Sequence, residues 1–579
     1  MKARIATILI ALSAILLDSC SDFLDFKPKG TLTPEEASKA VNANALVTAA
    51  YAAIGNDFWD RSITSMWVYG SVRSDDAYKG GGSINDQFTI NRIEQYNLTT
   101  PNENDYLPQT WTQLYAIVSR ANIAIQSLTA LTDAEFPNKK KRIAEMRFLR
   151  GHAHFLAKVM FNRIPYIDET LTREQILETS NVLFTSDQMW DKIAADFQAA
   201  ITDLPNDQGA EKGRANALAA KAYLAKTRLY QAYAKDPITH AVTAISASRL
   251  NEVVTLTTDV INSGKYGLQP DFAENFLDGF DNGPESVFAV QFSINDGTTI
   301  GRLGMATSLN YSLAPQYGCC WFHMPSQNMV NAFKTEPVTG LPMFDTFNNT
   351  SIDEFTITPT GHTVDPRIDH TVGIANHPFK YNPRILYSHS WERLSALYGG
   401  FGNMKEQQEA TCSCFKKVGP FYGSSKNIDI IRYADVLLMK AEALIELNTN
   451  LDEARTLINM VRTRAAASTG RTRRLDGTFP SNFKTSTYDG ANLTWNQTNA
   501  RKAMQWERRL EFAMESPRFF DLVRWGIAAE TLNAYLAVEK TRRTYLSAAV
   551  FTKGRDEYYP IPQREINFTK GLYVQNPGY

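Results

Sequence analysis

The chain carries almost no net charge, since 60 lysines and arginines face 61 aspartates and glutamates, for a formal charge of −1 at pH 7. Both signs are interspersed along the sequence. Recognition of a nucleic-acid backbone or of an anionic membrane surface depends on an excess of lysine and arginine. The composition therefore predicts no nucleic-acid partner and no membrane contact through charge.

Long hydrophobic runs are also missing. The one apolar stretch of note runs from Ile5 to Leu17, after Lys2 and Arg4. It is shorter than the roughly 20 residues that a membrane-spanning helix needs. A basic start followed by a short apolar stretch is typical of a secretory signal peptide, which we place at residues 1–19.

The end of this run resembles a bacterial lipobox. Leu17, Ser19 and Cys20 match that motif, whereas Asp18 departs from the small or apolar residue that is usual there. The resemblance implies that the signal is removed and that Cys20 carries acyl chains, palmitate among them, which tether the protein firmly. The alternative is a plain secretory signal with a chance cysteine at its end.

Cysteine is scarce in the rest of the chain. Four cysteines follow Cys20, in "YGCCWFHMP" and "ATCSCFKK". An even number outside the cytoplasm favours disulfides, and the C-C and C-x-C spacings are not those of structural zinc sites. We expect a disulfide that links the two segments; reduced buried thiols and a metal site are the alternatives. The residues concerned are Cys319, Cys320, Cys412 and Cys414.

Familiar catalytic and cofactor motifs are missing too: there is no G-x-S-x-G, no Walker loop, no dinucleotide fingerprint and no EF-hand loop. His152 and His154 stand two apart, so on a helix they point to different faces and do not form a zinc pair. In "ERRLEFAMESPRFFDLVRWG", arginines interleave with glutamates and would keep them ionised, the wrong state for a general acid. We expect an ion-paired helix there, and no enzyme, cofactor or metal site.

What the chain does have is helical periodicity at both ends. "WTQLYAIVSRANIAIQSL" and "KRIAEMRFLRGHAHFLAKVM" place apolar residues at three- and four-residue steps. "RYADVLLMKAEALIELNTNLDEARTLINMVRTRAA" indicates two helices joined by "NTN", about the 34 residues of a tetratricopeptide unit. Such units bury their apolar faces only by stacking. We therefore predict a mostly α fold, with a tetratricopeptide-like helical scaffold (an α-solenoid) built from both ends of the chain.

Between these ends, glycine, proline, asparagine and aromatic residues crowd the sequence, and only short strands such as "SVFAVQFSI" are indicated. Long irregular segments of an ordered domain are often functional. The predicted division is a signal peptide at 1–19, an N-terminal helical part at 20–264, a loop-rich lobe at 265–425 and a C-terminal helical part at 426–579. Residues 20–579 are expected to form one compact unit.

Taken together, these blocks resemble the SusD/RagB family of outer-membrane glycan-binding lipoproteins. The blocks that carry the resemblance include "CSDFLDFKPKG", "GRANALAAKAYLAKTRLY", "IRYADVLLMKAEAL", "ERRLEFAMESPRFFDLVRWG" and the C-terminal "YYPIPQREINFTKGLYVQNPGY", which occur in the family's order. The resemblance implies a lipid-anchored protein exposed on the outer membrane, which binds oligosaccharides and hands them to a SusC-like TonB-dependent transporter. It implies binding without catalysis.

Sugar binding calls for a flat aromatic ring that stacks on the apolar face of a pyranose, beside polar groups for its hydroxyls. Two irregular stretches supply both, one from Asn56 to Pro108 and one from about Lys265 to Ser425. For any single ring, a position in the core is the alternative. We prefer Trp321, because a disulfide in its loop would hold the ring rigid and reduce the cost of binding. The candidate ligand-binding residues are Trp321, Tyr311, Tyr78, Asp75, Asn104, Tyr106 and Trp391.

Two other functions fit the same sequence. The chain could bind a peptide in place of a glycan, as a surface lipoprotein of the same transporter type, or it could be a surface glycosidase. A glycan array set against a peptide library separates the first alternative, and release of reducing ends from polysaccharide would establish the second. The sequence does not identify the glycan.

Overall fold

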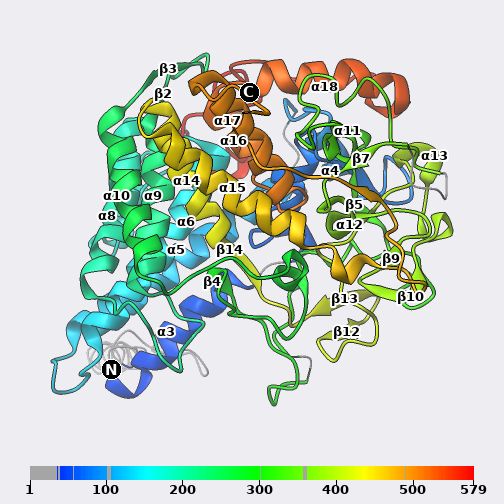
Figure 1. Cartoon of the computed structure of the whole chain (residues 1–579). Coiled ribbons are helices and arrows are strands. Elements are labelled where there is room, and N and C mark those ends of the chain that lie inside the picture. The colour runs from blue at the N-terminus through cyan, green and yellow to red at the C-terminus, as the bar shows by residue number, and fades with distance from the viewer. Residues whose placement is uncertain are drawn as a thin grey trace, which may run out of the picture.

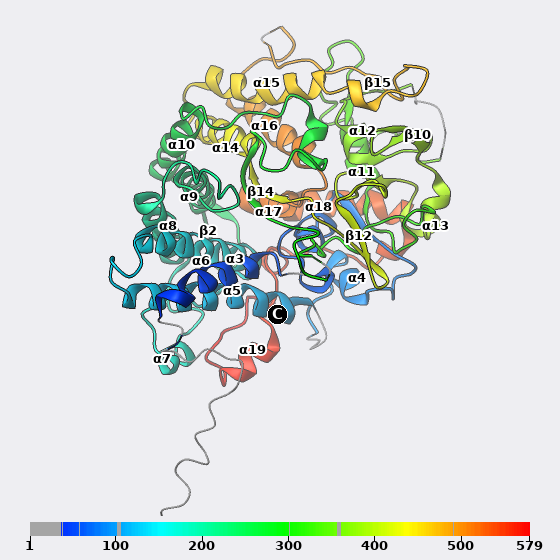
Figure 2. The ribbon, with the colours of Figure 1, turned by 90° about the horizontal axis from the view of Figure 1, so that it is seen from below.

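The structure, a computed structural model, describes residue 36 and residues 39–56, 58–100, 106–299, 301–355, 361–489 and 491–579. The predicted lipidation site Cys20 and the candidate Asn104 lie outside these residues. Figure 1 labels the helices and strands, and Figure 2 gives a view from below.

An arc of antiparallel helices makes up the N-terminal half, and each helix contacts the next. The alanine-rich segment forms α9, in which Ala217, Ala219, Ala220, Ala222 and Ala225 are buried, so that neighbouring backbones approach closely. The Thr185 side chain caps α8 in a reciprocal capping box with Gln188. The helices are α3 (Ala40–Ile54), α5 (Tyr106–Ala130), α6 (Lys139–Phe161), α8 (Ser186–Asp203), α9 (Ala217–Ala232) and α10 (Ala247–Asn262).

The C-terminal half continues the same arc. Helix α14 packs against α10, and α15 and α16 pack against α14. The "NTN" turn between α14 and α15 is real, because Asn448 and Asn450 take left-handed backbone conformations that asparagine tolerates. The prediction of a helical scaffold assembled from both ends of the chain is confirmed. The helices are α14 (Tyr433–Glu446), α15 (Leu451–Ala467), α16 (Gln497–Phe512), α17 (Arg518–Trp525), α18 (Ala528–Arg542) and α19 (Gln563–Phe568).

The lobe between the two halves consists of loops, short helices and two- or three-stranded sheets, on the right of Figure 1. Its strand pairs include β1 (Ala77–Gly80) with β5 (Phe322–Pro325), β12 (Phe415–Val418) with β13 (Phe421–Ser424), β9 (Pro378–Phe379) with β10 (Asn382–Leu386) and β8 (Val372–Gly373) with β11 (Gly402–Asn403). A three-stranded sheet has the order β15 (Asn482–Phe483), β7 (Thr363–Val364), β6 (Lys334–Thr335). Its helices are α11 (Gln327–Ala332), α12 (Ile368–Thr371) and α13 (Ser395–Tyr398). The remaining elements are α4 (Phe88–Glu94), α7 (Arg173–Leu177), and the hairpin β2 (Tyr233–Lys235) and β3 (Val242–Ile245).

One strand pair closes the lobe onto the scaffold. Strand β4 (Ser286–Val290) runs antiparallel to β14 (Ile428–Arg432), which leads directly into α14. The two ends of the lobe therefore lie side by side. The exact lobe boundaries at 265 and 425 stay predictions.

Two hydrophobic cores fill the molecule. The large one joins the helices of both halves, and a smaller one inside the lobe is built almost wholly from aromatic rings. Helix α18 ties this second core to the C-terminal half, since Tyr78 donates a hydrogen bond of 2.5 Å to Glu539. Among the residues described, no helix has both the length and the apolar character that a membrane crossing requires.

Candidate functional site: a polar cleft between scaffold and lobe

The structure brings four of the predicted aromatic residues together, in the second core. Tyr78, Tyr311, Trp321 and Trp391 are 0, 1, 1 and 8% exposed. The ring of Trp321 stacks on Tyr387, and the tyrosine ring also meets Trp391 edge-on. The core position, which the sequence left open for any single ring, therefore holds for these four, because aromatic residues of separate lobe segments pack on one another. Their role in ligand binding stays a prediction.

The predicted polar candidates are also held by the protein itself. Asp75 is 2% exposed and accepts hydrogen bonds from Arg518. Burial acts to raise the pKa of Asp75, but Arg509 and Arg518 together lower it to about 2. Tyr106 is buried at the start of α5, edge-on to Trp59 at 5.8 Å.

The cysteines pair within each segment. Cys319 is bonded to Cys320, and Cys412 is bonded to Cys414. The predicted disulfide between the two segments is therefore wrong, as is the alternative of reduced thiols, because each sulfur has its partner one or two residues away. Asp278 lies beside Cys412 and Cys414, but sulfurs in a disulfide do not offer thiolates to a metal.

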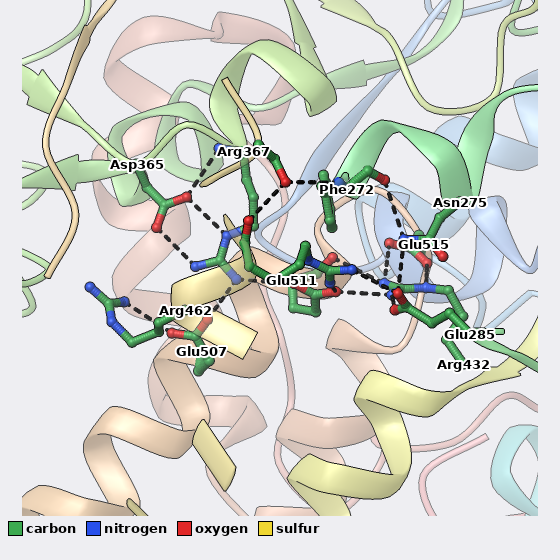
Figure 3. Close-up of polar contacts among 12 residues, drawn as sticks. Phe272, Asn275, Glu285, Asp365, Arg367, Arg432, Arg462, Glu507, Glu511 and Glu515 are labelled. Carbon is green, nitrogen blue, oxygen red and sulfur yellow. Dashed lines mark hydrogen bonds and ion pairs between the residues drawn. The ribbon is translucent and has the colours of Figure 1, made fainter. Parts of the chain in front are cut away.

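A buried network of charges surrounds helix α16 (Figure 3). Glu507 accepts hydrogen bonds from Arg367 at 2.6 Å and from Arg462 at 3.0 Å. One turn further, Glu511 accepts from Arg367 at 3.1 Å and Arg432 at 2.9 Å, and from Arg464. Arg367 comes from the lobe, Arg432 from β14, and Arg462 and Arg464 from α15. The network therefore joins the lobe to α15 and α16.

The network keeps the Glu511 carboxylate charged. Burial acts to raise the pKa of Glu511, but Arg464, Arg432 and Arg367 hold it well below its ordinary value. A carboxylate in that state does not serve as a general acid near neutral pH. The prediction of ion-paired glutamates is confirmed, although their main partners lie across the fold. The sequence signal for the missed partners was already present in "DPRI" and "IRYAD", which contain Arg367 and Arg432.

At one end the network opens into a cavity of about 120 Å³, which we call the polar cleft. Glu515 forms its charged floor: it accepts hydrogen bonds from Arg432 at 2.9 Å and from Lys405 at 2.6 Å, and it is 21% exposed. The Lys405 ammonium lies 4.8 Å from the centre of the Phe276 ring. Burial lowers the pKa of Lys405 to about 8.

Asp429 is the carboxylate of the cleft with the fewest protein partners. Its side chain accepts a hydrogen bond of 2.5 Å from Ser286, at the start of the neighbouring strand β4. Burial raises the pKa of Asp429 to about 6, against the opposing charges of Lys426 and Arg432. A carboxylate with spare acceptor capacity in a partly open cavity suits the hydroxyl groups of a ligand.

Amides complete the lining. Gln408 donates to the carbonyl of Phe276 at 3.1 Å, and Asn275 donates to Glu285 at 3.3 Å. A neighbouring cavity of about 120 Å³ adds aromatic and apolar walls, and it shares part of the cleft's lining. The shared residues are Thr64, Ser65, Asp429, Arg432 and Glu515. Carboxylates, amides and an aromatic face in one place suit a polyhydroxylated ligand.

Comparisons with known proteins agree with this architecture. The model described as "SusD family" matches residues 284–579, and the model described as "Starch-binding associating with outer membrane" matches residues 22–229. The SusD-like protein P2 of Formosa agariphila is 24% identical over 591 residues, covering 100% of each chain.

Solved structures show the same fold. A SusD-like carbohydrate-binding protein of Bacteroides fragilis superposes with a TM-score of 0.68 at 22% identity, over 92% of this chain and 99% of that one. Surface glycan-binding protein A of Bacteroides thetaiotaomicron, solved with laminarihexaose, gives 0.65 at 21% identity, over 93% of this chain and 99% of that one.

Proposed function

The chain belongs to the SusD family, and on that premise we propose that it is a surface-exposed, lipid-anchored glycan-binding protein of the outer membrane. It captures oligosaccharides and hands them to a SusC-like TonB-dependent transporter. No bond is broken in this role. The proposal draws on the glycan-binding descriptions of relatives with the same fold.

The polar cleft is the observation that supports a ligand site in this chain. Its charged floor is held rigid by the network, so little conformational freedom is lost when a ligand enters. Asp429 would accept hydrogen bonds from sugar hydroxyls, while Gln408 and Asn275 orient the ring above Phe276. A ligand held by few groups binds modestly, since a millimolar complex needs only about 4 kcal/mol.

Isothermal titration with a panel of neutral oligosaccharides, set against a peptide library, tests the function. The Asp429→Asn variant tests the site, and Asp452→Asn on α15, where the side chain is 86% exposed, is the matched control. Loss of one charged hydrogen-bond acceptor predicts affinity at least about tenfold weaker for Asp429→Asn and unchanged for the control. Unchanged affinity in both variants would exclude the cleft, and binding of peptides alone would exclude the function.

The anchor and the partner have tests of their own. Metabolic labelling with palmitate is expected to mark the wild type and not Cys20→Ala. Affinity purification from detergent-solubilised outer membranes is expected to recover a TonB-dependent transporter with the chain. A wild type without label would contradict the lipid anchor. A wild type that purifies without a transporter would contradict the partner.

A further inference from the structure

Another pocket, of about 260 Å³, lies on the scaffold and is lined in part by the β2–β3 hairpin. Its lining comes from the end of α6, the start of α8, the end of α9, the hairpin and α17. Val159, Tyr230 and Phe520 line both this pocket and the cavity beside the polar cleft, so they form the wall between them. Nothing in the proposed function uses this pocket.

Three cationic side chains converge on the pocket without carboxylate partners. Lys158 donates to the backbone and side-chain oxygens of Asn162 at 2.9 and 2.6 Å. Arg163 donates to the carbonyl of Gln575 at 2.5 Å, and Lys235 donates to the carbonyl of Val523 at 2.6 Å. Within the part of the chain that the structure describes, none of the three forms an ion pair.

Two carboxylates, Asp187 and Asp236, also line the pocket, but each accepts hydrogen bonds from other groups of the protein and neither forms an ion pair with the three cations. Asp187 accepts from Gln231 at 2.7 Å, and Asp236 accepts from the backbone of Thr239 at 2.7 Å inside the hairpin turn. Burial raises the pKa of Glu557 to about 7, so this group only partly offsets the positive charge of Lys235. The remaining cation, Arg524, is neutralised by Glu442 and Asp521.

Burial and neighbouring positive charges lower the pKa values of both lysines. Burial, with repulsion from Lys235 and Arg163, lowers the pKa of Lys158 to about 7. Burial also lowers the pKa of Lys235 to about 7, with Arg524 acting in the same direction. His240 is 3% exposed, its Nε2 has no hydrogen-bond partner, and burial lowers its pKa to about 4. Unpaired buried cations are costly, and a bound anion would relieve that cost.

We propose that this pocket binds an acidic sugar unit through its carboxylate or sulfate group. The oxyanion would lie among Lys158, Arg163 and Lys235 and accept charge-assisted hydrogen bonds from them. The sugar ring would pack on the wall formed by Trp190, Tyr230 and Phe184. The site is separate from the polar cleft. A failure to bind acidic sugars here would therefore not contradict neutral glycan binding in the cleft, and the reverse also holds.

Isothermal titration at pH 6 with four probes tests the proposal: glucuronate, glucose 6-sulfate, neutral glucose and inorganic sulfate. We expect one or both acidic sugars to bind, neutral glucose not to bind, and inorganic sulfate to bind at least tenfold more weakly than the sulfated sugar. Binding of only one acidic sugar identifies which oxyanion the pocket takes. Equal binding of inorganic sulfate would overturn the role of the ring, and no binding of either acidic sugar would overturn the site.

Variants locate the binding. Lys235→Met should weaken acidic-sugar binding at least tenfold. Lys140→Met, exposed at the start of α6 and so at the opposite end of that helix from Lys158, should leave it unchanged. Arg163→Gln is the second variant, for use if Lys235→Met does not fold as judged by circular dichroism. Full binding in a folded variant of either residue would overturn the proposal.

The pH dependence adds an independent reading. Raising the pH from 6 to 8.5 passes the pKa of about 7 of both lysines, so the pocket loses their two positive charges and affinity should fall at least tenfold. The acidic sugars themselves stay ionised over this range. An affinity that is constant between pH 6 and 8.5 would contradict the assignment of the lysines.

Discussion

Glu511 is bound by three arginines of the charge network, and the Glu511→Gln variant tests how much this carboxylate contributes to the stability of the fold. The carboxylate accepts hydrogen bonds from Arg367, Arg432 and Arg464, and its side chain is 0% exposed. Glutamine keeps the size and shape of the side chain but removes the negative charge that these arginines share. All three arginines keep another carboxylate, since Arg432 and Arg464 still donate to Glu285 and Arg367 to Asp365, but one negative charge is lost and the local positive charge is left in excess.

Removing one partner of a buried ion pair typically costs about 3–5 kcal/mol. The entropy of unfolding at the melting temperature is about 2.1 cal/mol/K per residue, which amounts to roughly 1.2 kcal/mol/K for this chain of 579 residues. The variant should therefore melt about 3–4 °C below the wild type.

Differential scanning calorimetry at pH 7 measures the shift, with the exposed Glu530→Gln on α18 as the matched control. The control makes the same chemical change on the surface and should melt within about 1 °C of the wild type. A Glu511→Gln variant that melts with the control would show that the arginines do not depend on this carboxylate, and would refute the reasoning.

Three further predictions concern pH, the second core and the cysteines. The folded-state pKa of Glu511 lies below the ordinary value of 4.5, so its contribution is complete above pH 4.5 and is lost as the pH falls toward the folded pKa; the melting difference between wild type and Glu511→Gln should shrink in scans at pH 3.5, and a constant difference would contradict the lowered pKa. Trp321→Ala should cost about 3–5 kcal/mol and lower the melting temperature by about 3–4 °C; loss of glycan affinity in the folded variant would establish the predicted ligand role, and an unchanged melting temperature would contradict the burial of the ring. Peptide mapping by mass spectrometry without reductant should find Cys319 linked to Cys320 and Cys412 linked to Cys414; a peptide joining the two segments would restore the pairing expected from the sequence.

The scaffold could be predicted from the sequence because its information is local. A helix can be predicted from apolar residues three and four positions apart, as in the stretch that forms α5. The "NTN" turn likewise needs only its own residues. The packing of C-terminal on N-terminal helices followed from the fact that such helices cannot bury their faces alone, although the sequence did not indicate that α10 is the partner of α14.

The lobe resisted prediction because its structure depends on distant partners. Whether Trp321 faces solvent is decided by Tyr387, which lies far along the chain and stacks on it. The same holds for α16, where the spacing of glutamates and arginines suggested local pairs, while Glu507 instead meets Arg367 and Arg462. Asp429 gave no signal at all, since a carboxylate in a short strand becomes notable only when a cavity opens beside it.

The pairing of β4 with β14 also bears on the order in which the chain can fold. Translation delivers the N-terminal helices first, yet the helix that covers α10 begins only at Tyr433, after the whole lobe. Bringing distant segments together costs closure entropy that local helix contacts do not. Nascent or truncated chains that end before β14 thus present an unfinished helical edge, which makes them the species that chaperones would have to shield.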